Sequence, residues 1–243
     1  MIKALSFFGL LLPAVCFAGH PLTTDDTGTQ GTGQWQYEFN TEFATLDTAR
    51  EQTWNSQLTY GLRDSLDVFI STPYQRLRSD LPDSSARGFN DPTIGLKWRF
   101  YERNGLSFGL IPSVSLPFAN DHNGLGNGRA TYSTRGLMQY TVGSFTWLTN
   151  VGYTRNNNVY GDRRNLLSAS TAGLYRLNEK ITLLADYGYS SNEDPDTSKP
   201  EGFALVGAIY SLNQKVDLDL GYKRGLNQQA LNHSWMAGAT LRW

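Results

Sequence analysis

The chain has 243 residues, and its 21 Lys plus Arg against 22 Asp plus Glu give a net charge of −1 at pH 7. This balance excludes the clustered basic excess that a nucleic-acid-binding protein needs to neutralise phosphates. A mean hydropathy of −0.41 excludes a bundle of membrane helices, whereas six Trp and 13 Tyr are more amphipathic rings than an ordinary soluble domain of this size carries.

The first eighteen residues have the pattern of a secretory signal peptide. Lys3 supplies a positive charge, residues 4–17 are largely apolar, and Cys16 and Ala18 are the small residues of a cleavage site. Cleavage after Ala18 would remove the only cysteine, so we expect no disulfide in the mature chain. Lipoprotein processing at Cys16 is the weaker alternative, because Val15 stands where that signal needs a small residue.

The segment that follows is polar, rich in Gly and Thr, and has no apolar face that could bind lipid. Its N-terminal motif consists of Thr24, Asp25, Asp26 and Gly28. We predict that the segment lies at or inside the periplasmic mouth of the barrel formed by the following strands; a frayed terminus is the alternative. The predicted organisation is therefore a signal peptide over 1–18, a periplasmic or lumenal segment over 19–32, and an outer-membrane β-barrel over 33–243.

From residue 33 onward the sequence alternates apolar and polar residues with a period of two. In the first segment Trp35, Tyr37 and Phe39 share one parity and polar residues take the other, and a strand places these sets on opposite faces. The alternation is weakest in 164–177 and 201–212. The twelve predicted strands cover 33–43, 52–62, 65–75, 92–101, 105–117, 129–141, 144–155, 164–177, 180–191, 201–212, 215–224 and 232–243.

The connections between these strands alternate in length. Every second one is a tight turn, as at 63–64 and 142–143, and most of the others are long polar loops, as at 77–91 and 192–200. This pattern predicts an all-β fold: a closed antiparallel transmembrane β-barrel of 12 strands, with short periplasmic turns and long extracellular loops. A soluble β-sandwich is the alternative, but nothing in that fold gathers the long loops on one side. Closure of a barrel also pairs the backbone N–H and C=O groups, which find no other hydrogen-bond partner in hydrocarbon.

The two parities identify the two surfaces of this barrel. All six Trp fall on the apolar parity, mostly near a strand end, where an aromatic girdle meets the membrane interface. The polar parity should line the lumen. The predicted membrane-interface residues are Trp35, Trp54, Trp98, Trp147, Trp235 and Trp243. The predicted pore-lining residues are Glu38, Lys97, Arg99, Arg135, Asp186, Asp217, Asp219, Lys223 and Arg242.

The charged pore-lining residues are distributed unevenly around the predicted ring. Positive side chains gather on the fourth and sixth strands, and negative ones on the ninth, eleventh and first. Twelve strands give a Cα diameter of roughly 24 Å, and side chains about 6 Å long would leave a gap on the order of 10 Å. We therefore expect a transverse electric field across a narrow aqueous lumen. A filled barrel whose charges pair directly is the alternative.

Three short stretches are similar to those of one known family. The run from His20 through Thr24, Asp25 and Asp26 to Thr29 looks like that family's opening, residues 88–91 are similar to its Gly-x-x-Asp approach to a membrane strand, and 111–117 resemble its Pro-containing strand. Where the family then continues with Thr-Gly, this chain has Phe-Ala at 118–119. The family is the bacterial outer-membrane one described as Putative MetA-pathway of phenol degradation. The resemblance implies a channel-like barrel, with hydrophobic or aromatic compounds among its candidate solutes.

Signals for catalysis and metal binding are weak. The neighbours His233 and Ser234 must point to opposite faces of a strand, so they cannot form the Ser–His pair of an outer-membrane phospholipase. The polar loops at 120–124 and 193–196 match no calcium-loop spacing, and we interpret them as solvated loops. We expect no catalytic residue, no cofactor and no metal site.

The sequence thus predicts an outer-membrane channel or transporter for the passive passage of small solutes. Its expected partners are the solute, outer-membrane lipid and lipopolysaccharide, and the barrel-assembly machinery, which would engage the C-terminal strand ending in Trp243; no nucleic acid is expected. Two functions from other classes remain as alternatives: a structural or adhesive barrel with a closed lumen, and a lipid-modifying barrel enzyme. Conductance in a planar bilayer separates the first prediction from both.

Overall fold

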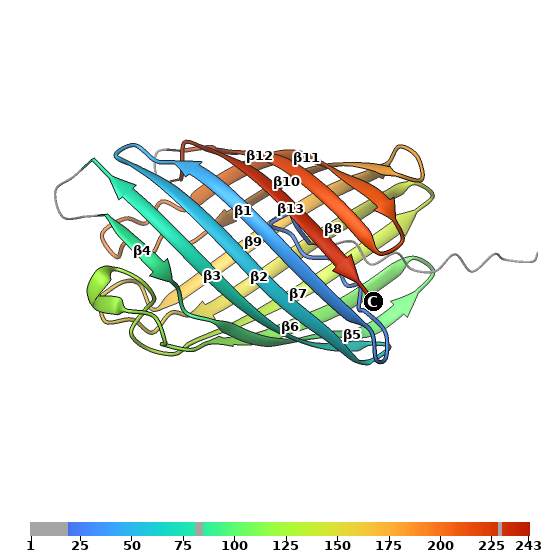
Figure 1. Cartoon of the computed structure of the whole chain (residues 1–243), viewed down its shortest axis with the longest axis horizontal. Coiled ribbons are helices and arrows are strands. Elements are labelled where there is room, and N and C mark those ends of the chain that lie inside the picture. Colours follow the sequence, from blue (N-terminus) through green and yellow to red (C-terminus); the bar gives the residue numbers. More distant parts are fainter. Residues whose placement is uncertain (1–18, 81–84, 228–229) are drawn as a thin grey trace, which may run out of the picture.

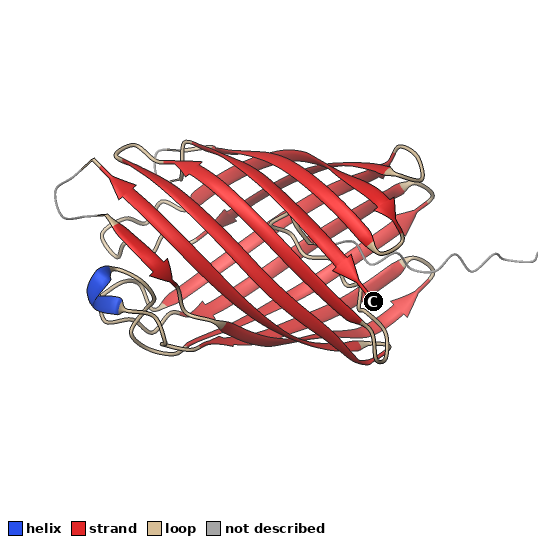
Figure 2. Ribbon diagram, in the orientation of Figure 1, coloured by secondary structure: helices blue, strands red, loops and turns tan. Residues whose placement is uncertain are grey.

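The computed structural model describes residues 19–80, 85–227 and 230–243, so the predicted signal peptide at 1–18 lies outside the described residues. Each strand pairs antiparallel with the next one along the chain, except that β5 pairs with β3 and not with β4, and β1 pairs with both β2 and β13, which closes the sheet into a barrel (Figures 1 and 2). No helix in these ranges is long and apolar enough to cross a membrane. The strands are β1 (Trp35–Thr45), β2 (Ala49–Arg63), β3 (Leu66–Ser79), β4 (Ala86–Phe89), β5 (Thr93–Arg103), β6 (Leu106–Ser115), β7 (Thr131–Val142), β8 (Phe145–Arg155), β9 (Asn165–Arg176), β10 (Ile181–Ser190), β11 (Glu201–Asn213), β12 (Val216–Gly225) and β13 (His233–Arg242).

The fourth position in the ring is shared by two strands. β3 pairs with β5 over 66–71 and with β4 over 74–77, so the thirteen strands occupy twelve positions and the predicted 12-strand barrel is confirmed. The predicted strand at 92–101 is β5, whereas the predicted loop at 77–91 contains the end of β3 and all of β4. Asn90 and Asp91 leave the ladder between β4 and β5. Their side-chain oxygens accept hydrogen bonds from loop amides, Asn90 from Gly126 at 2.6 Å and Asp91 from Asn127 at 2.8 Å.

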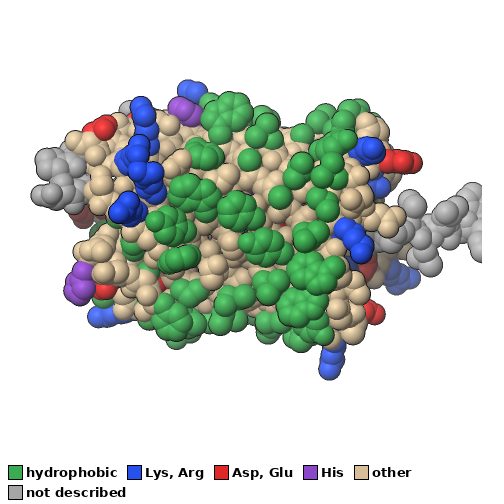
Figure 3. Space-filling model, in the orientation of Figure 1, with side chains coloured by type: hydrophobic (Ala, Val, Ile, Leu, Met, Phe, Trp, Pro, Cys, Tyr) green, Lys and Arg blue, Asp and Glu red, His purple; other side chains and the backbone are tan. Residues whose placement is uncertain are grey.

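The outer wall carries a band of hydrophobic side chains with charged residues at both of its ends (Figure 3). Five of the six Trp have exposed side chains there, from 36% for Trp35 to 53% for Trp235, and Trp54 is half-buried against the ring of Tyr74. Trp35 stacks on Trp243 where the first and last strands meet, with ring centroids 6.5 Å apart. An apolar belt of this extent is unfavourable in water and is typical of a wall that faces lipid.

Candidate functional site

The lumen near the short-turn end holds residues 19–33, which precede β1 (Figure 1). Thr24 is fully buried there, and its amide and hydroxyl donate to the carboxylate of Asp186 on β10 at 2.9 and 2.6 Å. The amide of Thr23 donates a third hydrogen bond to Asp186, at 2.7 Å. Three donors on one buried carboxylate stabilise its charge, since charge-assisted hydrogen bonds are the stronger kind. Asp186 therefore anchors the first half of the segment.

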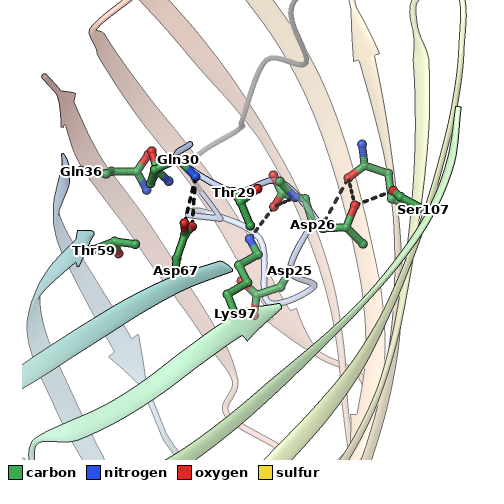
Figure 4. Close-up of polar contacts among 12 residues, drawn as sticks. Asp25, Asp26, Thr29, Gln30, Gln36, Thr59, Asp67, Lys97 and Ser107 are labelled. Atoms are coloured by element: carbon green, nitrogen blue, oxygen red, sulfur yellow. Dashed lines mark hydrogen bonds and ion pairs between the residues drawn. The ribbon is translucent and has the colours of Figure 1, made fainter. Parts of the chain in front are cut away.

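The second half of the segment runs along β3 and the turn between β2 and β3 (Figure 4). The amide of Gln30 donates to both carboxylate oxygens of Asp67, at 3.2 and 3.1 Å. The hydroxyl and amide of Thr32 donate to Asp64 in the turn, at 2.6 and 3.1 Å. These two hydrogen bonds, the hydroxyl first, lower the pKa of Asp64 from its usual 3.8.

Two wall glycines allow the segment to approach the barrel backbone. A Cβ on Gly61 of β2 would lie 1.8 Å from the carbonyl oxygen of Gly31, and one on Gly221 of β12 would lie 2.8 Å from the side chain of Pro21. Both distances are far below van der Waals contact. Any other residue at these two places would displace the segment, so glycine is required by close approach.

The charges of the segment complement those of the wall. Asp26 pairs with Lys97 on β5 at 2.6 Å, and Asp25 pairs with Arg135 on β7. On the opposite wall His20 contacts Asp219 on β12. The segment thus turns its acids toward the positive strands, and its histidine and backbone amides toward the negative ones. The open aqueous gap that the sequence suggested is divided by this segment, because the separated wall charges stabilise an oppositely charged chain between them.

The remaining predicted pore-lining residues also lie at inward-facing positions, and each has a polar partner. These contacts are Arg242 with Asp217 at 2.8 Å, Lys223 with Glu42 at 2.7 Å, Gln57 donating to Glu38 at 2.9 Å, and Arg99 with Glu102 at 3.2 Å. The pairing of Arg242 with Asp217 joins neighbouring strands across the ladder. Charge inside the barrel is therefore largely compensated.

One half of the lumen wall, here called the filled side, consists of β8 to β13. Its inward-facing apolar side chains pack into a buried cluster, and Leu22 of the N-terminal segment packs against it. Sequence reasoning missed this cluster, because several of its members lie in the two strands with the weakest alternation. The buried members are Leu148, Ala172, Leu174, Leu184, Leu205, Ile209 and Met236.

The other half, the polar side, consists of β1 to β7 and leaves space. A cavity of about 330 Å³ opens between this wall and the segment, lined mainly by amide, hydroxyl and charged side chains. A second cavity, of about 240 Å³, lies toward the long loops near β8 to β12. Thr23 and Arg135 line both cavities, so the two spaces adjoin at these residues. The wall residues of the first cavity are Gln36, Glu38, Asn40, Gln57, Thr59, Asp67, Phe69, Ser71, Thr93, Lys97, Ile111, Ser113 and Arg135.

The structure also places the residues that were considered for metal binding and for a Ser–His pair. Among the described residues no group of three His, Cys, Asp or Glu side chains could hold a metal ion. Ser234 points inward and donates to Glu42 at 2.6 Å, whereas the ring of His233 stacks on Tyr222. The predicted separation of His233 from Ser234 is therefore seen in the structure.

Comparisons with known proteins agree with this architecture. The sequence profile of the family described as Putative MetA-pathway of phenol degradation matches residues 18–243. The COG4313 outer membrane channel from Pseudomonas putida F1 has a TM-score of 0.72 and 16% identity, over 90% of this chain and 98% of that one. NanC porin has a TM-score of 0.59 and 11% identity, over 84% of this chain and 98% of that one. KdgM porin has a TM-score of 0.56 and 8% identity, over 85% of this chain and 98% of that one. No curated protein matches the chain in sequence.

Proposed function

This chain belongs to the family described as Putative MetA-pathway of phenol degradation, and from that premise we propose that it is an outer-membrane channel for small solutes and not an enzyme. The observation that carries the proposal is the pair of cavities that adjoin at Thr23 and Arg135 inside a barrel with an apolar outer wall. The fold shared with a channel and with porins supports it. Short turns would face the periplasm and long loops the exterior.

The lining of the larger cavity indicates the class of solute. Its many hydroxyl and amide groups offer hydrogen bonds, its acids and bases are nearly balanced, and Phe69, Ile111 and Leu22 add an apolar face. Such a surface suits a small polar or amphipathic molecule better than an ion, because neither sign of charge dominates. A hydrophobic or aromatic compound that carries a polar group fits the same description.

The test is conductance in a planar bilayer free of lipopolysaccharide. The wild-type protein should give a small, steady conductance with weak ion selectivity. Replacing Lys97 and Arg135 with Ala removes two positive charges from the cavity, and the cation-to-anion permeability ratio should rise roughly twofold or more. Lys180→Ala with Lys215→Ala, which removes the same charge at two exposed turns, is the matched control and should leave the ratio unchanged.

A closed structural barrel is the competing function, and the contacts of residues 19–33 with the wall are the observation in its favour. A wild-type protein that inserts into the bilayer and conducts nothing would support it. Under the channel proposal the segment narrows the lumen, and conduction passes through the two cavities that adjoin at Thr23 and Arg135.

A further inference from the structure

Four arginines gather on the outer wall at the long-loop end of β2, β3 and β4. In the β2–β3 ladder Arg50 lies directly opposite Arg78, and in the β3–β4 ladder Arg76 lies opposite Arg87. Their positions share the outward parity of Trp54 on β2 and its ladder partner on β3. Three of them are exposed and Arg76 is half-buried. Figure 3 shows Lys and Arg side chains gathered at this end of the wall, beside the hydrophobic band. We call these four residues the arginine patch.

The arginine patch is unfavourable for the protein alone. Like charges directly opposite each other on one face of a sheet destabilise the strand pairing, and the patch contains two such pairs. Within the described residues, none of the six salt bridges involves a patch arginine. An anion from outside the chain would offset this repulsion.

A groove of about 250 Å³ lies within the patch and has the form of a binding site. Arg50, Arg76 and Arg78 line it together with Phe43, which is 42% exposed. Glu51 also lines the groove, and its carboxylate accepts a hydrogen bond from the Thr53 hydroxyl at 2.9 Å. Three guanidinium groups against one carboxylate leave the groove positive, and the exposed ring beside them suits a ligand that is part phosphate and part hydrocarbon.

One more basic residue, Arg224, lies further around the barrel in the same cross-strand row as Arg50. Across the ladders, Arg50 lies opposite Thr45 on β1, Thr45 opposite His233 on β13, and His233 opposite Arg224 on β12. This row extends over five neighbouring strands from β12 to β3. A ligand that carries more than one phosphate can therefore contact Arg224 as well as the patch.

Aromatic rings set the height of the patch relative to the membrane. The rings of Trp54, Tyr74 and Phe89 pack in sequence, with centroids 5.8 and 5.2 Å apart, two residues or more from the arginines and away from the loop end. Amphipathic rings lie at the headgroup level of a bilayer. Guanidinium groups just beyond the rings therefore lie where lipid phosphates lie, and guanidinium binds phosphate through paired hydrogen bonds.

We propose that the arginine patch binds the phosphate groups of lipopolysaccharide in the outer leaflet, with the groove taking one phosphorylated sugar and Phe43 meeting the adjoining acyl chain. The inference rests on the proposed orientation, with long loops outside the cell, but not on whether the lumen conducts. It assigns a specific lipid site to one part of the barrel circumference.

Binding of purified lipopolysaccharide to the folded protein in phosphocholine nanodiscs tests the site. Replacing all four patch arginines with Gln should weaken binding at least about tenfold, since each basic group near a charged lipid surface contributes appreciably. The matched control replaces Arg63, Arg103, Lys180 and Lys215 with Gln, which removes the same charge at the short-turn end, and should bind like the wild type. Equal weakening in both variants would overturn the proposal.

Further arms identify the source of the phosphate. Enzymatically dephosphorylated lipopolysaccharide should bind at least about tenfold more weakly to the wild type, and equal binding would overturn the proposal. Phosphatidylglycerol nanodiscs or inorganic phosphate that compete as well as lipopolysaccharide would also overturn it, in favour of a general anion site. A four-fold Arg→Lys variant keeps the charge if the Gln variant fails to fold, and it should show an intermediate loss. Conductance in lipopolysaccharide-free bilayers should be unchanged in every patch variant, which separates this test from that of the channel.

Discussion

The filled side and the polar side of the lumen contact the same N-terminal segment in different ways. On the filled side Pro21 is fully buried and Leu22 packs on the apolar cluster, while Asp186 accepts three hydrogen bonds from the segment. On the polar side Asp67 accepts hydrogen bonds from one amide, Asp26 and Asp25 of the segment pair with Lys97 and Arg135, and the larger cavity remains beside these contacts. Apolar burial adds to hydrogen bonding on the filled side, whereas the polar side holds the segment mainly by hydrogen bonds and ion pairs. The filled side therefore adds apolar packing to the anchoring of the segment, and the larger of the two cavities lies on the polar side.

Deleting residues 20–30 removes the segment from both sides of the lumen and should have the largest effect. Gly19 is kept so that the predicted cleavage site is preserved. Without the segment the lumen should approach the gap of about 10 Å expected for twelve strands, so single-channel conductance should rise about threefold or more. Planar-bilayer recording measures it. Unchanged conductance would mean that the segment does not narrow the route of the ions.

Truncating buried side chains of the apolar cluster should lower the stability of the protein, whereas truncating a side chain on the polar side should change it little. Leu148→Ala and Leu205→Ala should each reduce the free energy of unfolding by about 2–4 kcal/mol, because both side chains are almost completely buried. Ser113→Ala, in the wall of the polar cavity, is the control and should change it by about 0.5 kcal/mol or less. Urea unfolding in lipid vesicles measures all three, and comparable losses would refute the distinction between the sides.

The carboxylates of Asp186 on the filled side and Asp67 on the polar side should also differ in how strongly they anchor the segment. Asp186→Asn weakens three hydrogen bonds and should release the segment more than Asp67→Asn. The free energy that holds the segment against the wall should fall by about 2–3 kcal/mol in the Asp186 variant and by about 1 kcal/mol in the Asp67 variant. A reporter cysteine, Thr29→Cys, measures release, because predicted signal cleavage removes the chain's only cysteine. Its labelling rate should rise most in the Asp186 variant. A larger rise in the Asp67 variant would reverse the assignment of the stronger anchor.

The smallest effect concerns pH at the turn that holds the end of the segment. Thr32 lowers the pKa of Asp64, so its contribution is complete above the usual value of 3.8 and is lost as the pH falls through the lowered pKa. Open-channel noise should therefore increase only in strongly acidic buffer. In Thr32→Ala the increase should begin at higher pH. An identical pH profile in both proteins would show that this contact does not steady the segment.

Much of the fold could be predicted from the sequence, and the prediction of twelve strand positions is confirmed. Trp35, Tyr37 and Phe39 alternate with polar residues, and this local pattern decides which face of β1 meets lipid. Strand β4 lies in the predicted loop at 77–91 and was not predicted, and neither was the break between β4 and β5. It depends on Asn90 and Asp91 bonding to loop residues about 30 positions further along the chain, and no local pattern reports such a partner.

The filled side was missed for a related reason. In β9 and β11 the inward residues Leu174, Leu205 and Ile209 are apolar, but apolar residues such as Leu167 and Val206 also face outward. The alternation of apolar and polar residues in these two strands is therefore weak, and it does not reveal that their inward faces are apolar. The inward parity did identify the charged positions Lys97 and Arg135, yet their partners in the N-terminal motif could not be found from strand spacing.

The sequence by itself determined the strand positions, the inward and outward faces, the alternation of turns and loops, and the family resemblance, because each of these is written in residues close together along the chain. Only the tertiary structure decided what fills the barrel. Closure of the ring brings β10 and β12 opposite β5 and β7, and residues 19–33 then find complementary charges on both walls. Attraction between residues more than 70 positions apart depends on their distance in space, and that distance exists only after the barrel has closed.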